Sequence, residues 1–320
     1  MKKIKKILTI REEKIHFTDE AALKVQLNNI RHTPVHYHSN SLELIYCVKG
    51  YVDILCNHET VRLMPNEIFS VDYEDLHCIY SDSDNLVIQI HLNMNSLSTS
   101  REYLENVYFA CQDAGCQSYQ REALEKVKNL VLATAYKYAQ KTLQKQEIKG
   151  IANQFTNTFL SNFDWFNYLD MYPNQNELLR QRIQRILAYC MKHYTEKITI
   201  SHMADLVHID KNYFSQFMRK SPYGSFSSMM GYIRCYHAQY MMLETEYSIT
   251  EVAYRCGFSD EKYLYKNFHS WWGKTPTEHR RWFKKYITAP DNIQSIPESE
   301  AIKILSPFIA LHFVNNNINS

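Results

Sequence analysis

The strongest constraint on this 320-residue chain is a pattern that occurs twice, about fifty residues apart, between Ile198 and Phe283. Repetition at such a period usually marks repeated structural units. The first copy, TISHMADLVHIDKNYFSQFM, runs from Thr199 to Met218, and the second, SITEVAYRCGFSDEKYLYKNF, runs from Ser248 to Phe268. Each copy predicts two short helices joined by a tight turn.

Capping residues mark where these helices begin. Thr199 precedes the first helix of copy one, and Ser248 precedes that of copy two, where Glu251 completes a capping box. Asp210 and Ser259 are the expected caps of the second helices, because their side chains accept bonds from the free amides of the first turn. Both copies therefore follow the same local rules.

Small and apolar residues then define how the two helices of each copy pack. Ala204 and Ala253 let a second helix cross closely, and Gly257 suits a turn that needs a positive φ. The pattern is typical of a helix-turn-helix. The expected buried faces of the second helices are Tyr213, Phe214, Phe217 and Met218 in copy one, and Tyr263, Leu264 and Phe268 in copy two.

A long helix is expected between the copies. Ser225 to Leu243 contains Gly231 as its single glycine or proline, and apolar residues recur there at three- and four-residue steps. At about 1.5 Å per residue the helix is roughly 27 Å long, close to the ~34 Å that separates successive turns of DNA on one face. The two copies could therefore read one face of a duplex twice.

This order, with GFSD in copy two and GKTPTEHRR after it, resembles the DNA-binding domain of the AraC/XylS family of bacterial transcription regulators. The resemblance covers Leu178 to Phe283. Copy one departs from the family pattern, because its turn has no glycine and Asp210 replaces the commoner serine cap. The resemblance implies an all-α domain with two helix-turn-helix motifs that binds double-stranded DNA.

Base-edge contacts require polar side chains near the start of each second helix, whereas phosphate contacts require cations and carry no sequence information. A solvated surface charge is the alternative for each residue. The expected base-facing residues are Lys211, Asn212, Ser215, Gln216, Glu261, Lys262, Tyr265 and Lys266. The expected phosphate contacts are Arg219, Lys220, Arg255, Lys274, Arg280 and Arg281.

Charge is distributed unevenly along the chain. Leu178 to Tyr286 carries 17 lysine and arginine residues against 9 acidic residues, a net charge of +8. The whole chain carries +2, so the remainder carries −6. A basic module joined to an acidic one indicates that the C-terminal part faces a polyanion, and it disfavours helix-turn-helix repeats used for protein contacts alone.

Composition and termini indicate a cytoplasmic protein. The chain is 45% hydrophobic and 22% charged, and no apolar run is long enough for a membrane span. The N-terminus reaches Arg11 to Lys14 before an apolar core forms, so a signal peptide is not expected. Scattered cysteines without a C-x-x-C pair favour free thiols over disulfides or zinc: Cys47, Cys56, Cys78, Cys111, Cys116, Cys190, Cys235 and Cys256.

Residues 1–98 predict an antiparallel β-sandwich or barrel. Residues 1–30 are expected to be a charged lead-in with edge strands at Ile4 to Ile10 and Lys14 to Phe17. Short alternating or apolar runs separated by turn residues follow. These runs are Leu42 to Val48, Tyr51 to Cys56, Thr60 to Met64, Ile68 to Val71, His77 to Tyr80 and Leu86 to Leu92.

Two segments of this region resemble the cupin motifs. His36-x-His38-x4-Glu43-x6-Gly50 resembles the first motif, and Pro65 to His77 resembles the second, with Asn66 where glycine is usual. The resemblance implies a cupin-like sensor domain whose effector pocket is lined by His36, His38, Glu43, Tyr46 and His77. In metal cupins three histidines and a glutamate ligate a divalent ion, so His36, His38, Glu43 and His77 are an alternative metal site. Pocket lining without metal or cofactor is the favoured interpretation.

Several tyrosines of the same region could stack on a sugar ring, but in a chain with 24 tyrosines core packing explains most of them. Recognition of a sugar is therefore suggested by the family resemblance alone. The tyrosines in question are Tyr37, Tyr46, Tyr51, Tyr73 and Tyr80.

The rest of the chain divides into a helical segment, the DNA-binding domain and a tail. Residues 99–172 show helical periodicity in Arg121 to Gln146 and Ile148 to Leu169, which suits packing on the sheet and dimerisation. The break at Pro173 to Asn176 begins the DNA-binding domain, residues 173–286. The role of residues 287–320 stays open.

The sequence thus predicts an α+β, non-enzymatic transcription regulator, an activator that recruits RNA polymerase as a homodimer and responds to a small-molecule effector. The alternative is a metal-dependent cupin enzyme fused to a DNA-binding domain. Copy two is better capped and has the turn glycine, so we expect it to be more firmly formed than copy one.

Overall fold

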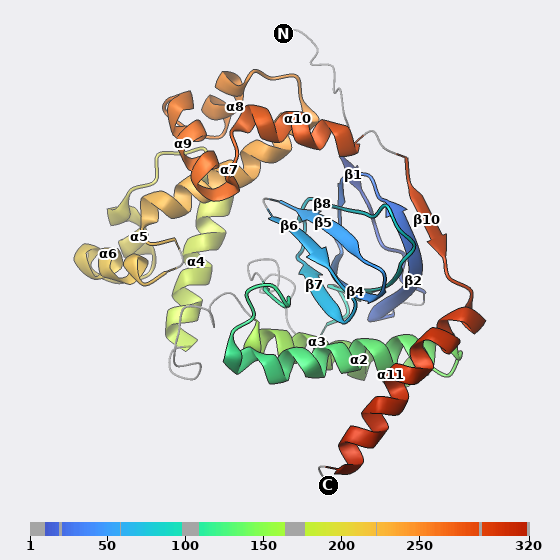
Figure 1. The fold of residues 1–320 in the computed structure, drawn as a ribbon. Coiled ribbons are helices and arrows are strands. Elements are labelled where there is room, and N and C mark those ends of the chain that lie inside the picture. Colours follow the sequence, from blue (N-terminus) through green and yellow to red (C-terminus); the bar gives the residue numbers. More distant parts are fainter. Residues whose placement is uncertain are drawn as a thin grey trace. The chain divides into compact units, whose positions relative to one another are not determined.

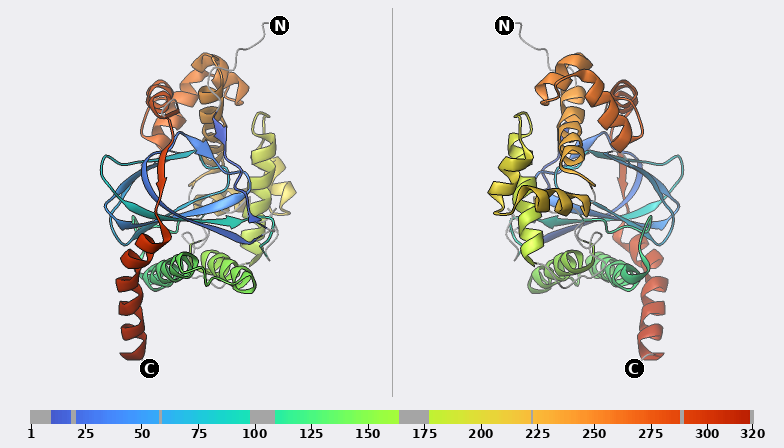
Figure 2. Two further views of the ribbon diagram at one scale, coloured as in Figure 1. Left: turned by 90° about the vertical axis from the view of Figure 1, so that its right-hand side faces the viewer. Right: turned by 90° about the vertical axis from the view of Figure 1, so that its left-hand side faces the viewer.

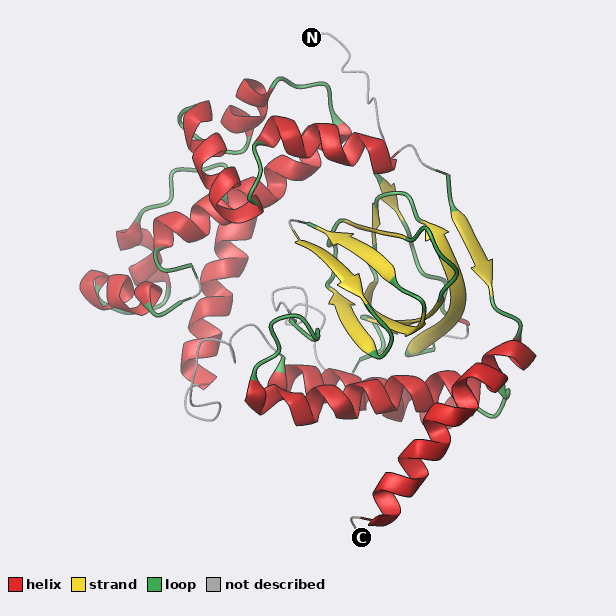
Figure 3. Cartoon of the chain, in the orientation of Figure 1, coloured by secondary structure: helices red, strands yellow, loops and turns green. Residues whose placement is uncertain are grey.

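The computed structural model describes residues 10–18, 21–57, 59–97, 109–163, 177–221, 223–287 and 290–318. Two compact units emerge (Figures 1 and 3). The sheet unit comprises Glu12–Asn167 and Ala289–Ser320, and the helical unit comprises Met1–Arg11 and Tyr168–Thr288. The helical unit is therefore inserted in the sequence of the sheet unit. Among the helices in these ranges, none is both long and apolar enough to cross a membrane.

An antiparallel sheet forms the core of the sheet unit, with the strand order β1-β3-β8-β2-β9-β4-β7. Strand β5 pairs with β6 and β8 outside this path. The strands of the N-terminal part are β1 (Arg11–Glu12), β2 (Leu23–His32), β3 (His36–Tyr37), β4 (Ser41–Lys49), β5 (Val52–Cys56), β6 (Glu59–Leu63), β7 (Glu67–Val71), β8 (His77–Tyr80) and β9 (Leu86–Asn93).

The six strands expected from Leu42 to Leu92 are present, with boundaries that differ by one residue at most ends. The expectation for residues 1–30 was wrong in part: Lys14 to Phe17 forms no strand, and the ten-residue β2 was missed. Its signal was present, because Leu23, Val25 and Leu27 alternate with polar residues. Apart from Ile10, the strand expected at Ile4 to Ile10 lies outside the described residues.

Alternation along β4 sets the inner face of the sheet. Ile45 and Cys47 belong to a buried apolar cluster that also contains Ile30 and Ile54. Since side chains two residues apart share a face, Glu43 points to the same side as Ile45. The strand therefore carries one buried carboxylate to the same side as this apolar cluster.

Two helices, α2 (Arg121–Ala139) and α3 (Lys145–Asn162), follow η2 (Ser118–Gln120) and lie side by side beneath the sheet (Figure 2). One helix had been expected over Arg121 to Gln146, but α2 ends at Ala139 because Lys141 adopts a positive φ of 60°. The predicted helix end at Leu169 and domain break at Pro173 lie outside the described residues.

The C-terminal tail rejoins the sheet unit. Strand β10 (Asn292–Ser295) pairs antiparallel with β2, and α11 (Glu298–Ile318) packs against α2. Ala301 and Leu305 on α11 are fully buried, and Glu298 forms an ion pair with Lys141 at 2.8 Å. The tail, whose role the sequence left open, thus adds an edge strand and a helix to the sheet unit (Figure 1).

In the described part of the helical unit the chain forms seven helices. They are α4 (Glu177–His193), α5 (Ile200–Leu206), α6 (Lys211–Arg219), α7 (Phe226–Glu244), α8 (Ile249–Arg255), α9 (Glu261–Trp272) and α10 (Pro276–Ile287). The two helix-turn-helix motifs, α5–α6 and α8–α9, flank the long helix α7 as predicted.

The predicted caps are present with one correction. Thr199, Asp210 and Ser248 accept bonds from first-turn amides, and Ser248 with Glu251 forms the full capping box. The cap of α9 is Asp260 rather than Ser259, since its carboxylate accepts from the amide of Lys262.

Both turns contain a residue with a positive φ, but the residue differs between the two copies. Gly257 has φ of 83° in copy two, and His208, at the equivalent place in copy one, has φ of 54°. A Cβ at Gly257 would lie 2.7 Å from the carbonyl oxygen of Tyr194, so glycine is required there for space as well as conformation. His208 is exposed, and its left-handed backbone is a strained choice for a residue with a Cβ.

We predict that His208→Gly stabilises the helical unit by up to about 1 kcal/mol, because relief of the left-handed strain exceeds the added entropy of the unfolded chain. Gly257→Ala should destabilise it by more than about 1 kcal/mol. Urea unfolding followed by tryptophan fluorescence reports mainly on this unit, which contains three of the four tryptophans, Trp271, Trp272 and Trp282. Equal, small effects of both substitutions would contradict the assignment of the two turns.

Candidate functional site

The first candidate site is the exposed face at the start of α6 and α9. Lys211, Asn212 and Gln216 on α6 are exposed, as are Lys262 and Lys266 on α9. Ser215, Glu261 and Tyr265 are half-buried and bond within the unit: Ser215 to the carbonyl of Lys211, Glu261 to Thr250, and Tyr265 to Thr277. The structure therefore places the eight predicted base-facing residues in the first two turns of α6 and α9. Five of them are exposed to solvent, and three are half-buried and hydrogen-bonded within the unit.

Two tyrosines expected in the core are instead on the surface. Tyr213 is 51% exposed and Tyr263 is 44% exposed. They hold the third position of α6 and α9, directly before the buried Phe214 and Leu264. Successive helical residues point about 100° apart, and the buried side of each helix lies in the direction of Phe214 or Leu264, which leaves the preceding tyrosine outside it. The two tyrosines join the exposed faces of these helices.

The six predicted phosphate contacts are of three kinds: exposed cations, cations that stack on an aromatic ring, and Arg280, which bonds to backbone carbonyls. Arg219, Lys220 and Arg281 are exposed. Arg255 is exposed but stacks over the ring of Tyr247 at 4.1 Å, and the Lys274 ammonium lies 3.3 Å from the ring centroid of Trp282. Partial burial lowers the pKa of Lys274.

Arg280 has a structural task that the sequence did not reveal. Its guanidinium donates to the carbonyl oxygens of Met242, at 3.0 Å, and Tyr247, at 2.8 Å. These bonds tie α10 to the C-terminal end of α7, where backbone carbonyls lack helical partners. The structure thus directs the side chain of Arg280 toward the protein interior, away from a polyanion.

We predict that Arg280→Ala lowers the free energy of unfolding of the helical unit by about 1–3 kcal/mol, since two carbonyls lose a charged donor. Arg281→Ala should leave stability unchanged and reduce the salt-dependence slope of duplex binding by about 1. Lys266→Ala should change preference at one or two base pairs. Unfolding curves and duplex titrations at several salt concentrations check all three variants, and a fully stable Arg280→Ala protein with a reduced slope would refute the distinction.

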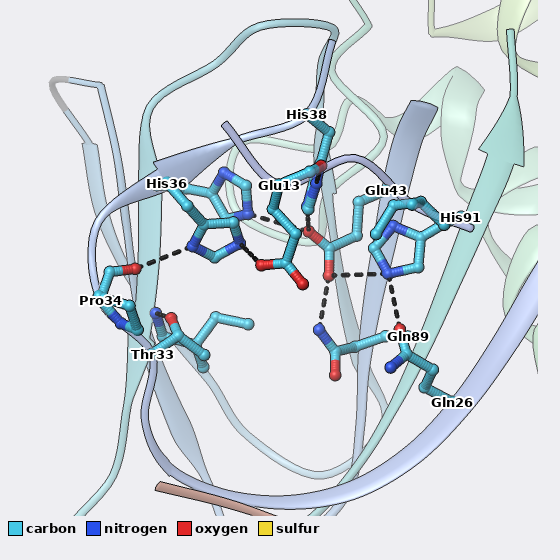
Figure 4. Close-up of polar contacts among 12 residues, drawn as sticks. Glu13, Gln26, Thr33, Pro34, His36, His38, Glu43, Gln89 and His91 are labelled. Atoms are coloured by element: carbon cyan, nitrogen blue, oxygen red, sulfur yellow. Dashed lines mark hydrogen bonds and ion pairs between the residues drawn. The ribbon is translucent and has the colours of Figure 1, made fainter. Parts of the chain in front are cut away.

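The second candidate site is a cluster of histidines around Glu43 inside the sheet unit (Figure 4). Strand register builds it: His36 on β3 faces His77 on β8, and Glu43 on β4 faces His91 on β9. His38, two residues after His36, returns to the same side. The four histidines and Glu43 are each at most 5% exposed. The structure therefore gathers four of the five predicted pocket residues.

The fifth predicted pocket residue, Tyr46, is elsewhere. It lies three positions after Glu43 on β4 and so points to the opposite face, where its hydroxyl donates to Asn66 at 2.7 Å. Burial and the nearby carboxylates of Glu125 and Asp113 raise its pKa. Tyr46 is part of the packing on that face and does not line the cluster.

Three of the histidines are held by backbone carbonyls. The Nδ1 atom of His36 donates to Pro34 at 2.8 Å, that of His38 to Glu13 at 2.9 Å, and that of His77 to Asp75 at 2.9 Å. A carbonyl accepts hydrogen bonds only, so each Nδ1 carries a proton. When these rings are neutral, Nε2 is therefore the atom with the free lone pair.

The carboxylate of Glu43 is divided between two sets of partners. Its Oε2 lies 3.0 Å from His77 Nε2 and 3.3 Å from His38 Nε2, and its Oε1 accepts from Gln89 at 2.7 Å. Burial opposes its charge, but the surrounding imidazoles hold its pKa well below the usual range. The cluster is thus organised around an ionised carboxylate.

The histidines differ in charge. Burial lowers the pKa of His36 well below its ordinary value and that of His91 to about 3. Burial also opposes the charge of His38, yet the hydrogen bond and charge of Glu43 raise its pKa. A charged His38 beside Glu43, with the neutral imidazoles of His36 and His91 nearby, is the arrangement that these directions support.

Sequence reasoning missed three members of this site. His91 donates to Gln26 at 3.0 Å, Gln89 holds Glu43, and the Glu13 carboxylate lies 3.7 Å from His36. Gln89 and His91 alternate on β9, which is a recognisable period-two signal for one strand face. Their link to Glu43 required the pairing of β9 with β4.

A groove of about 520 Å³ lies along β2 in the same unit. Its walls include Val25 and Leu27 of β2, Tyr138 and Ile148 of the helical hairpin, and Ile296 of the tail. This volume falls within the range of ordinary small-molecule sites. No sequence pattern pointed to it, since its walls come from three distant segments.

Comparison with known proteins gives two family matches. An AraC-like ligand binding domain matches residues 17–101, and a helix-turn-helix domain matches residues 203–281. The uncharacterized HTH-type transcriptional regulator YdeC of Bacillus subtilis is 22% identical over 281 residues, 82% of this chain and 91% of that protein.

A second relative is the uncharacterized HTH-type transcriptional regulator SACOL0084 of Staphylococcus aureus, 19% identical over 242 residues, 75% of this chain. The chain spans 31% of that relative's length. Among solved structures, ToxT from Vibrio cholerae has 10% identity, a TM-score of 0.40 and coverage of 84% of this chain and 99% of its own. The DNA-binding domain of AdpA has 22% identity, a TM-score of 0.30 and coverage of 34% and 96%.

Proposed function

Because the chain belongs to the AraC/XylS family of transcription regulators, we propose that it binds specific double-stranded DNA and adjusts transcription in response to an effector held by its N-terminal domain. The observation that carries this proposal is the pair of helices α6 and α9, each capped by an aspartate and each presenting exposed polar residues from its first turn. Such N-terminal faces are the parts of reading helices that enter the major groove.

The spacing of the two motifs supports a bipartite DNA site. Helix α7 has 19 residues, about 28 Å at the standard rise, and separates the motifs in sequence. The +8 charge of the segment from Leu178 to Tyr286 supplies the electrostatic attraction to phosphates. A site with two half-sites about one helical turn apart follows from this geometry.

The finer parts of the proposal concern partners and response. We propose an activator that works as a cytoplasmic homodimer, with contacts through the helices α2 and α3, and that recruits RNA polymerase. The effector would bind in the sheet unit, either at the cluster around Glu43 or in the groove along β2. Polar and apolar walls in that groove suit a small organic molecule.

Selection of duplexes from a random library tests DNA recognition directly. We expect the full chain to enrich two short blocks with centres about 10–10.5 base pairs apart. A single enriched block would mean that one helix-turn-helix does not read bases, and no enrichment would refute sequence-specific binding. Tyr254→Ala, a change of an exposed residue on α8 outside both reading helices, is the matched control and should retain both blocks.

The effector response has its own test, which follows from thermodynamic reciprocity. An effector that tightens DNA binding must itself bind more tightly when the selected duplex is present, by the same factor. Titration calorimetry with and without duplex measures both affinities. Equal affinities would refute equilibrium coupling between the two units without affecting the conclusion on DNA binding.

A further inference from the structure

We propose that the helical unit has a small-molecule site of its own, a cavity between its two helix-turn-helix motifs that binds a small aromatic carboxylate. The cavity has a volume of about 390 Å³, within the range of ordinary ligand sites. Its walls come from three segments: the entry to α5, the first half of α7, and the turn and second helix of copy two. The site goes beyond the proposed function, because it can be occupied without DNA and without an effector in the sheet unit.

The two side walls of the cavity are anchored to α7. On one side, Arg234 donates to the carbonyl oxygens of Tyr194, at 2.8 Å, and Glu196, at 2.9 Å, and so holds the segment that leads to α5. On the other side, α9 approaches α7 so closely at Gly231 that a Cβ there would lie 2.0 Å from Oδ1 of Asn267. The walls are therefore in place before a ligand arrives, which lowers the cost of binding.

Arg234 gives the cavity a positive charge. Its side chain is half-buried, and its two hydrogen bonds go to neutral carbonyls. In the described part of the chain it forms no ion pair, and among the described residues that line the cavity there is neither an aspartate nor a glutamate. A partly buried cation without a counter-ion favours an anionic ligand. A carboxylate can accept two of the three guanidinium N–H groups that the carbonyls leave.

The remaining walls favour a flat apolar ring. Phe226, Met230 and Phe258 line the cavity and are at most 7% exposed, and the 44% exposed Tyr263 lines it as well. Aromatic rings pack on one another with centroids about 4.5–7 Å apart. The guanidinium of Arg234 lies 5.9 Å from the ring centroid of Phe258. A ligand ring that packs on Phe258 therefore has its acid group within reach of Arg234.

A ligand in this cavity would touch both motifs. Ile198 and Ile200 belong to the entry and first turn of α5 in copy one, whereas Ser259 and Tyr263 belong to copy two. The bound acid would add a contact between two motifs that α7 joins. Occupancy would therefore stabilise one relative arrangement of the two motifs within the helical unit.

Titration of the full chain by ¹⁹F NMR tests the site with three acids: 4-fluorobenzoate, 4-fluorophenylacetate and 5-fluoroindole-3-acetate. We expect saturable binding of about one molecule per chain for at least one acid, about tenfold or more tighter than binding of its neutral amide. Ser227→Phe, which fills the cavity from an exposed position of α7, should weaken binding of that acid about tenfold or more. Ser201→Phe, the same change at an exposed position of α5, is the matched control and should leave the affinity unchanged.

A second pair of variants separates recognition of the charge from stability. Arg234→Met removes the cation, and Arg280→Met is its matched control, because Arg280 also donates to two backbone carbonyls of the helical unit. Both changes should lower the free energy of unfolding by similar amounts, as measured with urea. Only Arg234→Met should abolish the preference for acid over amide. Loss of the preference in both variants, or in neither, would contradict the role of Arg234.

Hydrogen exchange tests the contact with both motifs. Saturating acid should slow amide exchange in the peptides covering residues 198–204 and 258–264 of the wild-type protein, and in neither peptide of Ser227→Phe. Protection of one peptide alone would refute the contact between the motifs.

Two results would overturn the site itself: wild-type protein that binds none of the three acids, or binding that Ser227→Phe leaves unchanged. If no acid binds and Arg234→Met lowers the salt-dependence slope of duplex binding by about 1, a DNA phosphate occupies the cavity instead. Circular dichroism verifies that each variant is folded.

Discussion

The buried carboxylate of Glu43 is the interaction on which the sheet unit depends. A charge that is 1% exposed must be compensated, and the compensation comes from β3, β8 and β9 together with the turn that carries His38. Each partner is in turn held by a backbone carbonyl or an amide. The register of the strands therefore determines whether the cluster forms. A shift of β4 by one residue would turn Glu43 out of the cluster and bring an apolar residue in.

The helical unit is built from two helix-turn-helix motifs that share their packing but differ in their turns. Both helix-turn-helix motifs bury an alanine of the first helix and the apolar face of the second helix, and in both an aspartate caps the second helix. They differ at the turn, where copy two has Gly257 and copy one has His208 in the same left-handed region. That copy one is the less firmly formed of the two stays a prediction, and the left-handed backbone of His208 is the structural feature that supports it.

The tail changes how the sequence order should be understood. With β10 and α11 added to the sheet unit, the helical unit is an insertion whose two ends both lead to the sheet unit. Side-chain hydrogen bonds lead from Ser295 on β10 through Asn28 and Gln89 to Glu43. The strand that follows the helical unit in the sequence is therefore three hydrogen bonds away from the buried carboxylate.

Local signals in the sequence determined much of this protein: the capped helices, the repeat, the family, the strands from Ser41 to Asn93 and the residues of the H-x-H and Glu43 motif. These features depend on neighbours within a few residues, so spacing reveals them. Tertiary structure alone decided the partners of Glu43 on β9, the inward role of Arg280, the exposure of Tyr213 and Tyr263, and the return of the tail to β2. Each of these depends on which distant segment packs against the residue, and that choice follows from burial of the whole chain rather than from any local pattern.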